Sequence, residues 1–299
     1  MSKLNRIMMI AAVLVFVSAI GNVLYAETKK LGEPLMMMHY DEVVWDEDRD
    51  LELQIHYITN VEDERRLISL DFESLASNKT MVQQRGVNSF TFSWQGNQMY
   101  NDQVGRYYTM KTAYVQVSLD DQDITALNEE GSIKLSKASA GYSDGSYAVV
   151  DVGEMRLLSQ PIQDNLVRPN HRGQGMPEFT ASFKVQTPIE ITSVDLPFVA
   201  SHTDLLDFRI LVDGNESYSL EDLQRIETPI KAKVYIELIY TSISGDLNSN
   251  WLAGRVHPEI HYSSSDGPGS FRSVFSQSNW QLDEKSVESY VNLWRQDNE

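Results

Sequence analysis

Residues 44–60 read VWDEDRDLELQIHYITN, and the second half of this stretch alternates strictly between apolar and polar side chains. Successive side chains of an extended chain point to opposite sides. Leu51, Leu53, Ile55 and Tyr57 therefore share one face, while polar residues occupy the other. The pattern predicts a half-buried β-strand that begins near Leu51.

The same alternation returns along most of the chain. It is found at residues 68–72, 90–94, 113–119, 179–185 and 230–241. Clusters of Asp, Asn, Gly and Ser separate these runs, as at 120–121, 144–145, 213–215 and 263–269. Short strands divided by turn residues favour antiparallel sandwiches over a parallel sheet with crossing helices. We therefore predict a mostly β protein with two antiparallel, immunoglobulin-like β-sandwich domains in tandem.

One segment has neither strand nor helix periodicity. Residues 161–177 contain three prolines and two glycines, a composition typical of a linker. We therefore place the first sandwich domain at residues 31–160 and the second at residues 178–282.

Residues 283–296 give the clearest helical signal. Val287, Tyr290, Val291 and Trp294 form one apolar stripe at helical spacing. We expect a short amphipathic helix that docks on the last sheet of the second domain, with a partner-binding helix as the alternative.

Residues 1–26 have the layout of a secretory signal. Lys3 and Arg6 precede a long apolar run, and Ala26 is a candidate for the last residue removed. The alternative is an uncleaved membrane anchor, because residues 7–26 carry no charge and are long enough to span a bilayer. In both cases the remaining chain is expected outside the cell or in the cell envelope. If residues 1–26 are not cleaved, they are expected to be its only membrane contact.

The composition limits the class of protein and its partners further. The chain has 299 residues, no cysteine and a formal net charge of −18; removing residues 1–26, with two basic residues and no acidic ones, would leave −20. Such acidity argues against nucleic acid as a partner. An exported chain without cysteine has no disulfides and no lipid-bearing thiol, which favours a bacterial surface protein.

The carboxylates of Asp46, Asp48 and Asp50 fall at every second position before the first clear strand. Their spacing resembles the start of a Ca²⁺-binding loop. The sixth position of that loop would be Leu51 and the twelfth Tyr57, where glycine and glutamate are required. We interpret residues 46–50 as a solvated hairpin turn, with a weak calcium site as the alternative; no other cofactor is predicted.

Two motifs suggest catalysis or metal binding. Residues 141–145 match G-x-S-x-G around Ser143, but a strand rather than a helix is predicted to follow, so a serine hydrolase is disfavoured. His257, Glu259 and His261 would share one strand face, yet the two outer residues would lie about 13 Å apart. We expect exposed histidines there rather than a zinc site.

Two further groups have side chains that suit ligand binding. Met36, Met37, Met38 and His39 offer soft ligands for copper(I), although only Met36 and Met38 would share a strand face and methionines of a sheet core are the more common explanation. Trp251 is expected in a polar loop and is the best candidate for an exposed aromatic binding residue, with packing over the edge of the sandwich as the alternative.

Together these patterns predict an exported, non-catalytic binding module of the cell envelope. Its partner would be an envelope protein, a peptide or a wall polymer, recognised by loops or by strand addition at a sheet edge. The alternatives are a secreted hydrolase and a calcium-binding envelope protein. No catalytic residue is predicted.

Overall fold

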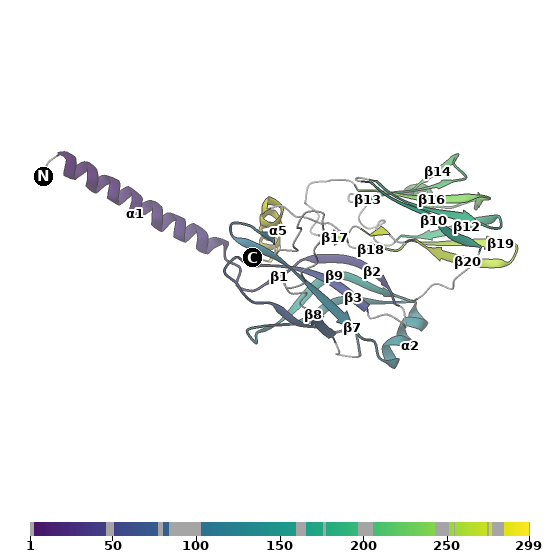
Figure 1. Cartoon of the computed structure of the whole chain (residues 1–299), viewed down its shortest axis with the longest axis horizontal. Coiled ribbons are helices and arrows are strands. Elements are labelled where there is room, and N and C mark those ends of the chain that lie inside the picture. Colours follow the sequence, from purple (N-terminus) through teal and green to yellow (C-terminus); the bar gives the residue numbers. More distant parts are fainter. Residues whose placement is uncertain are drawn as a thin grey trace, which may run out of the picture.

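The computed structural model describes residues 3–45, 51–76, 80–83, 103–159, 166–175, 178–196, 206–242, 251–253, 255–273, 275–276 and 284–298. Strands dominate this part of the chain, which confirms a mostly β protein with a few helices. Figure 1 shows two groups of strands, with helix α1 (Lys3–Lys29) projecting from one of them.

The group next to α1, the first sheet pair, consists of two sheets. One sheet has the order β1–β3–β7–β5, with β6 beside β7: β1 (Leu35–Met36), β3 (Leu51–Asn60), β7 (Tyr108–Val117), β5 (Thr80–Gln83) and β6 (Gln103–Val104). The other has the order β17–β2–β9–β8–β4: β17 (Trp251–Ala253), β2 (Met38–Val44), β9 (Tyr147–Leu158), β8 (Ser132–Tyr142) and β4 (Leu67–Phe72). The two sheets enclose one hydrophobic core.

The alternation in residues 51–57 builds this core as predicted. Leu51, Leu53, Ile55 and Tyr57 are buried, and the polar residues between them are partly exposed. In β4 the register shifts between Leu67 and Ser69, so that Leu67 rather than Ile68 enters the core.

The other group, the second sheet pair, has the same layered construction. One sheet has the order β10–β11–β16–β13–β14: β10 (Val167–Gly175), β11 (Glu178–Val185), β16 (Tyr235–Ser242), β13 (Leu206–Val212) and β14 (Glu216–Ser219). The other has the order β15–β12–β19–β20: β15 (Ile230–Ala232), β12 (Ile189–Asp195), β19 (Glu259–Ser264) and β20 (Gly267–Arg272). A second hydrophobic core fills the space between them.

The long alternating run at 230–241 is divided between both sheets of the second pair. β15 belongs to one sheet and β16 to the other, and Val234 between them is 58% exposed. The Asp213 carboxylate accepts hydrogen bonds from the backbone amides of Lys233, Val234 and Tyr235 at 2.8–3.0 Å. These bonds satisfy the amides where the chain changes sheets.

The two short helices begin at well-formed caps. α2 (Asp121–Glu130) starts after Asp120 and ends before Gly131, which has a φ of +76°. α4 (Leu220–Gln224) starts after Ser219, whose side chain forms a capping box with Asp222, as the sequence indicates. Residues 120–121 are thus a helix start rather than the turn expected between strands.

The C-terminal helix α5 (Glu284–Asn298) packs on the first sheet pair, so the expected docking on the last sheet is wrong. Val287, Tyr290 and Val291 share a buried cluster with Met37 and Tyr108, and the Tyr290 hydroxyl accepts a hydrogen bond from the Met38 amide at 2.9 Å. The chain therefore returns to the first sheet pair after building the second.

Two other expectations need correction. The first sheet pair is not purely antiparallel, because β2 pairs in parallel with both β9 and β17. Parallel neighbours need a long connection, and these partners lie far apart along the chain. The expected linker 161–177 contains strand β10, which pairs antiparallel with β11 despite a bulge at Pro169.

Candidate functional site

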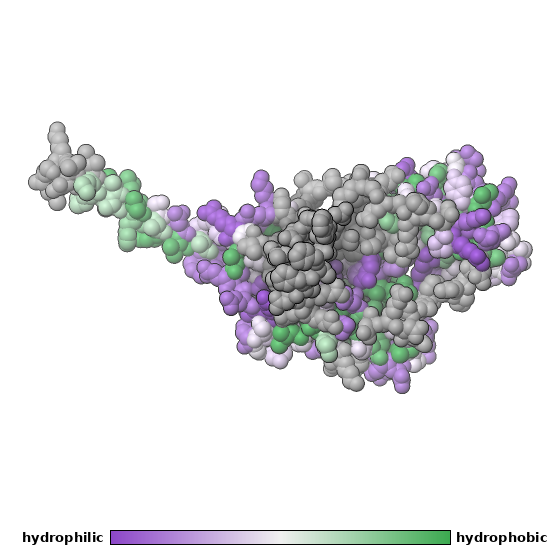
Figure 2. Space-filling model, viewed as in Figure 1, coloured by the Kyte–Doolittle hydropathy of each residue, from purple (hydrophilic) through white to green (hydrophobic). Residues whose placement is uncertain are grey.

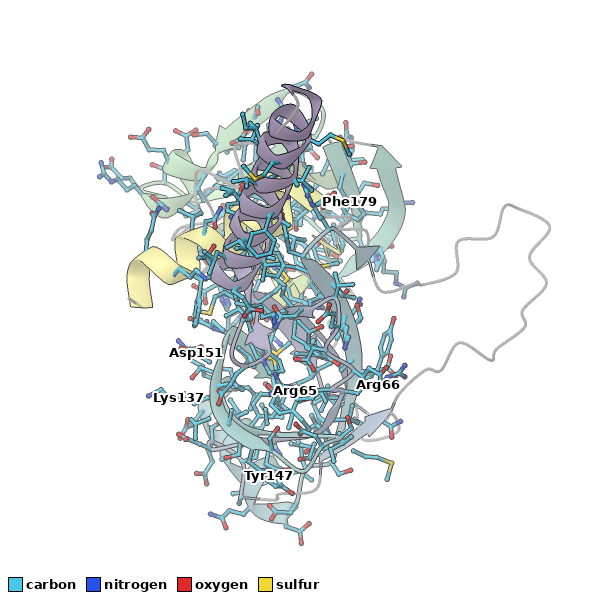
Figure 3. The ribbon with its side chains drawn as sticks, turned by 90° about the vertical axis from the view of Figure 1, so that its left-hand side faces the viewer. Arg65, Arg66, Lys137, Tyr147, Asp151 and Phe179 are labelled. Carbon is cyan, nitrogen blue, oxygen red and sulfur yellow. The ribbon has the colours of Figure 1, made fainter. Side chains whose placement is uncertain are left out.

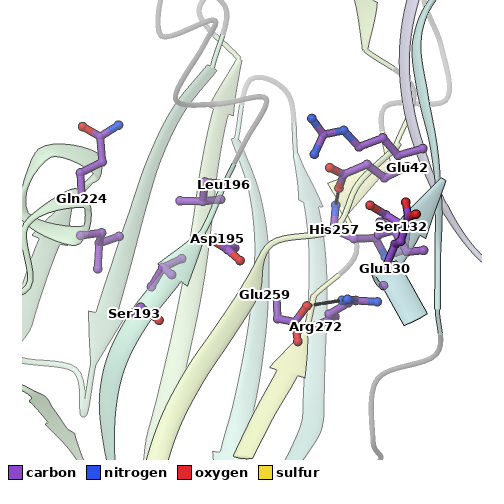
Figure 4. Close-up of a pocket in the computed structure, with 15 residues that line it drawn as sticks. Glu42, Glu130, Ser132, Ser193, Asp195, Leu196, Gln224, His257, Glu259 and Arg272 are labelled. Carbon is purple, nitrogen blue, oxygen red and sulfur yellow. Dashed lines mark hydrogen bonds and ion pairs between the residues drawn. The ribbon is translucent and has the colours of Figure 1, made fainter. Parts of the chain in front are cut away.

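A cleft of about 650 Å³ lies where the two sheet pairs meet. The first sheet pair contributes Glu42 from β2, Glu130 from α2 and Arg156 from β9. The second contributes Asp195, Glu259 and Arg272, and His257 lies just before β19. Figure 4 shows these side chains around the opening. We call this site the interpair cleft.

Glu42 is the most buried acid of the interpair cleft, with 2% of its surface exposed. Its carboxylate accepts hydrogen bonds of 2.5 Å from the Tyr40 hydroxyl and from the His257 amide. Burial raises the pKa of Glu42, although these two donors and the charges of Arg156 and Arg272 oppose the shift. Through its hydrogen bond to the His257 amide, Glu42 connects the segment around His257 to β2.

Arg272 connects the two sheet pairs directly. Its guanidinium donates to the Glu259 carboxylate at 2.5 and 2.8 Å, and to the Ser159 carbonyl at 2.6 Å (Figure 4 marks the ion pair). Burial of Glu259 opposes the effect of Ser270 and Arg272, which together lower the pKa of its carboxyl. The pair is held in a fixed position at the base of the interpair cleft.

Arg156 is held from the side of the first sheet pair. It forms an ion pair with Glu154, which also accepts a bond of 2.7 Å from the Lys134 ammonium group. Arg156 and Arg272 are thus both engaged with carboxylates. Glu130 and Asp195, at the rim, are more exposed.

Asp41, next to Glu42, anchors the returning chain a second time. Its carboxylate accepts from the Arg255 amide and Nε, both at 2.9 Å, and from Nη2 at 2.6 Å. Residues 255–257 are thus tied to β2 by two adjacent carboxylates, one directed to each face of the strand. This attachment fixes one wall of the interpair cleft relative to the other.

The charge balance of the interpair cleft is negative. Four carboxylates and two guanidinium groups line it, so its formal charge is −2 with His257 neutral. Among the described residues, no group of three His, Cys, Asp or Glu side chains is placed to hold a metal ion. The arrangement suits recognition of a positively charged group.

The calcium and aromatic binding candidates predicted from the sequence lie outside the interpair cleft or outside the described residues. Asp46, Asp48 and Asp50 lie outside the described residues. Trp251 begins strand β17, where it is paired with Met38 of β2, and its side chain lies outside the described part. Trp251 is therefore part of a sheet edge rather than a loop.

Ser143 lies in the tight turn between strands β8 and β9, as the predicted following strand implied. Its hydroxyl accepts a bond of 3.0 Å from the Arg66 amide, and its own amide donates to the Arg66 carbonyl. Figure 3 shows Arg66 near this end of the first sheet pair and Tyr147 at the exposed start of β9. A strand-to-helix elbow, required for a hydrolase nucleophile of this motif, is not formed.

Most of the histidine and methionine candidates are buried and pack against other side chains. His257 is buried beside Glu42, contrary to the expected exposure, whereas the His261 side chain is 38% exposed and lies 3.6 Å from Asp195. Met36 and Met37 are buried in two different hydrophobic clusters, as core methionines would be. His39 is also buried and stacks on His56.

Sequence reasoning missed Glu42, Glu130, Arg156 and Arg272. One signal was available: residues 35–45 read LMMMHYDEVVW, so that Asp41 and Glu42 interrupt an apolar strand. Two adjacent acids in such a run must either face solvent or find buried partners. Nothing local in the sequence identifies Arg255 and His257 as those partners.

No protein-family model and no curated protein sequence matches the chain. Among solved structures, the YadV chaperone shares 6% identity over 82% of this chain and 99% of its own, with a TM-score of 0.20. A chicken TCR shares 9% identity over 83% of this chain and 100% of its own, with a TM-score of 0.20. Fibronectin(III)-like modules of Clostridium thermocellum CbhA share 12% identity over 84% of this chain and 98% of their own, with a TM-score of 0.17. Scores of this size support no conclusion about function.

Proposed function

We propose that this protein is an exported, non-catalytic binding module of the cell envelope, in which two immunoglobulin-like sandwiches hold a ligand between them. The ligand is a positively charged segment of an envelope protein, a peptide or a wall polymer. The observation that supports this proposal is the interpair cleft, with its net negative lining drawn from both sheet pairs.

The size of the interpair cleft suits a short chain segment. Its volume of about 650 Å³ falls within the usual range of ligand sites, roughly 300–1,000 Å³. Glu130 and Asp195 at the rim meet an approaching cation first, and Glu42 and Glu259 lie deeper. Because Arg156 and Arg272 are bound by carboxylates, they stabilise the walls and leave the rim acidic.

Strand addition is less well supported than binding in the interpair cleft. The edge strand β10 contains Pro169 and the edge strand β20 contains Pro268. Proline lacks the amide that a ladder needs, and proteins use it to protect sheet edges. These two edges are therefore poor templates for another strand.

Binding of a ten-residue lysine peptide, measured by fluorescence anisotropy at low salt, tests the proposal. We expect binding that weakens with salt, and no binding of a glutamate peptide of the same length. The double variant Glu130→Gln/Asp195→Asn should weaken binding roughly fivefold, since exposed charge pairs contribute up to about 1 kcal/mol.

The control variant Glu73→Gln/Glu227→Gln makes the same change in charge at exposed positions outside the interpair cleft. It should bind the lysine peptide like the unmodified protein. Equal weakening by the two double variants would mean that net charge, rather than the interpair cleft, attracts the peptide. Absence of binding to the lysine peptide would contradict the proposal.

A further inference from the structure

We propose that α1 stays attached as a membrane anchor, and that a collar of Tyr25, Lys29, Arg106 and Tyr107 seats the first sheet pair on the phosphate groups of the phospholipid bilayer. This inference does not depend on the interpair cleft. It also extends the expectation that residues 1–26 alone contact the membrane, because two collar residues precede β7 in the folded body.

The first argument is the unpartnered apolar surface of α1. Residues Met8–Lys29 form one helical stretch long and apolar enough to cross a membrane, and no residue of its most apolar 18-residue window is buried by the described part of the protein. Twenty-two residues at about 1.5 Å each extend roughly 33 Å, close to the thickness of a bilayer core. Figure 2 shows the helix mostly in the hydrophobic colour where it projects from the body.

The second argument is the rigid attachment of the end of α1. Arg295 donates to the carbonyls of Thr28 and Lys30 at 2.8 and 2.9 Å, and the Tyr108 hydroxyl donates to the Lys29 carbonyl at 2.7 Å. Leu31 and the Asn60 side chain exchange two further hydrogen bonds. The last carbonyls of α1 are thus satisfied by the body, which leaves no flexible spacer between them.

The third argument is the chemistry of the collar. The rings of Tyr25 and Tyr107 meet edge to face at 6.2 Å. The Lys29 ammonium lies 5.4 Å from the Tyr25 ring centre, and the Arg106 guanidinium lies 5.2 Å from that of Tyr107. Tyrosines with neighbouring basic residues are the side chains enriched where a spanning helix leaves the bilayer.

Two acids lie close to the collar and have hydrogen-bond partners of their own. Glu27 is engaged with Lys30 at 2.6 Å, and Glu284 accepts a bond of 2.5 Å from the Arg106 amide. The ammonium of Lys29 and the guanidinium of Arg106 lie over aromatic rings. In a chain of net charge −18, these two side chains are the collar groups that can attract phosphate.

The fourth argument concerns the expected cleavage after Ala26. That bond lies inside α1, which continues to Lys29, and the site carries Leu24 where a small residue is typical. Cleavage would also remove Tyr25 and leave Tyr107 without its ring partner. The residue at position 24 and the ring contact of Tyr25 therefore support the anchor in this proposal.

The anchor is tested by expressing the full chain in a bacterial host and measuring the intact mass of the membrane fraction. We expect the protein to retain residues 1–26 and to resist alkaline carbonate extraction. A soluble product that begins at Glu27 would overturn the anchor.

The collar is tested with a fluorophore, since the chain has no cysteine of its own. In full-length protein reconstituted into phosphatidylcholine–phosphatidylglycerol vesicles, label is attached through Gly32→Cys, where a Cβ has open space, or through Ser265→Cys in the exposed turn far from α1 (Figure 1). Quenchers carried on lipid headgroups should quench the label at position 32 and not at 265.

Adding Lys29→Gln/Arg106→Gln should reduce quenching at position 32 by roughly twofold or more, because each basic residue near the surface contributes about 1 kcal/mol. The matched control Lys231→Gln/Lys233→Gln removes two exposed cations from the second sheet pair and should leave quenching unchanged. Circular dichroism confirms that each variant is folded. Equal quenching in both double variants, or at both labelled positions, would overturn the collar.

Discussion

The carboxylate of Asp41 accepts three hydrogen bonds from Arg255, which lies 214 positions later in the chain. The Asp41 side chain is 7% exposed, whereas that of Arg255 is 33% exposed. Loss of the guanidinium would leave a carboxylate that is largely removed from water. This ion pair is therefore a structural link between the start of the first sheet pair and the chain that returns to it.

Replacing Arg255 by Ala should lower the free energy of unfolding by roughly 2–4 kcal/mol, because Asp41 would remain buried without its charged partner. Arg255→Lys keeps the charge but not the paired geometry, so a smaller loss is expected. Urea denaturation followed by circular dichroism measures both. The exposed pair Lys231–Glu190 is the control, and Lys231→Ala should cost less than about 1 kcal/mol. Equal losses for Arg255→Ala and Lys231→Ala would contradict the prediction.

The stacked histidines His39 and His56 should make the protein sensitive to mild acid. Burial, with the neighbouring His56, lowers the pKa of His39 to about 3, and burial lowers the pKa of His56 to about 4. Unfolded histidine titrates near 6.5, so only the unfolded state gains these protons as the pH falls below that value. Stability is therefore lost from about pH 6.5 towards pH 4.

Each of these histidines should remove roughly 2 kcal/mol of stability between pH 7 and pH 5. In His39→Gln the amide oxygen can still accept from the His56 amide, as Nε2 of His39 does at 2.8 Å. This variant should lose about half of the pH dependence in urea unfolding. His261→Gln, at a partly exposed position, is the control and should keep it. An unchanged pH profile in His39→Gln would refute this assignment.

Asp213 stabilises the place where the chain crosses between the sheets of the second pair. Its φ is +50°, a value that Asp and Asn tolerate better than other side-chain-bearing residues. Asp213→Ala removes all three amide bonds and should cost roughly 2–3 kcal/mol, whereas Asp213→Asn should cost less. Thermal unfolding at pH 7 measures the loss of stability in both variants. Equal losses for Asp213→Ala and Asp213→Asn would mean that the three hydrogen bonds contribute little.

The same residue should contribute an acid-sensitive part of the stability. Burial opposes the shift, but three backbone amides lower the pKa of the Asp213 carboxyl below its ordinary value. The contribution of Asp213 to stability is therefore fully present above the ordinary pKa of Asp. It is lost as the pH falls through the lowered pKa of the folded state. Asp213→Asn should lack this component below about pH 4, as measured by unfolding at several pH values.

The turn interpretation of Asp46, Asp48 and Asp50 gives a simple calcium prediction. The melting temperature should be the same in millimolar calcium and in EDTA, because a solvated turn gains no stability from the ion. Scanning calorimetry of the full chain measures this. A rise with calcium that Asp48→Asn abolishes would instead support the calcium site.

Local patterns predicted the strands well and their partners poorly. The alternation at 51–57 predicts a buried face from neighbouring residues alone, and that face is observed. The crossing at Val234 was hidden, because Ile230, Ala232, Ile236 and Leu238 keep the same parity on both sides of it. A core between two sheets can accept inward-facing residues from either one, so periodicity does not reveal the change.

The candidate site was beyond the reach of sequence patterns for a related reason. Glu42 and His257 belong to segments about two hundred residues apart, and the parallel pairing of β2 with β17 brings them together. Spacing rules detect sites made by one helix, loop or strand. They do not detect contacts made when a distant segment comes back.

The return of β17 and α5 to the first sheet pair also sets the order of events during synthesis. Domains usually fold from the N-terminus as the chain is made. Here the strand that pairs with the outer edge of β2, and part of the cluster that covers Met37, are supplied by residues after 250. The half that is made first must therefore stay incomplete until nearly the whole chain has been synthesised, and until then its unpaired strand edge is open to association with other chains.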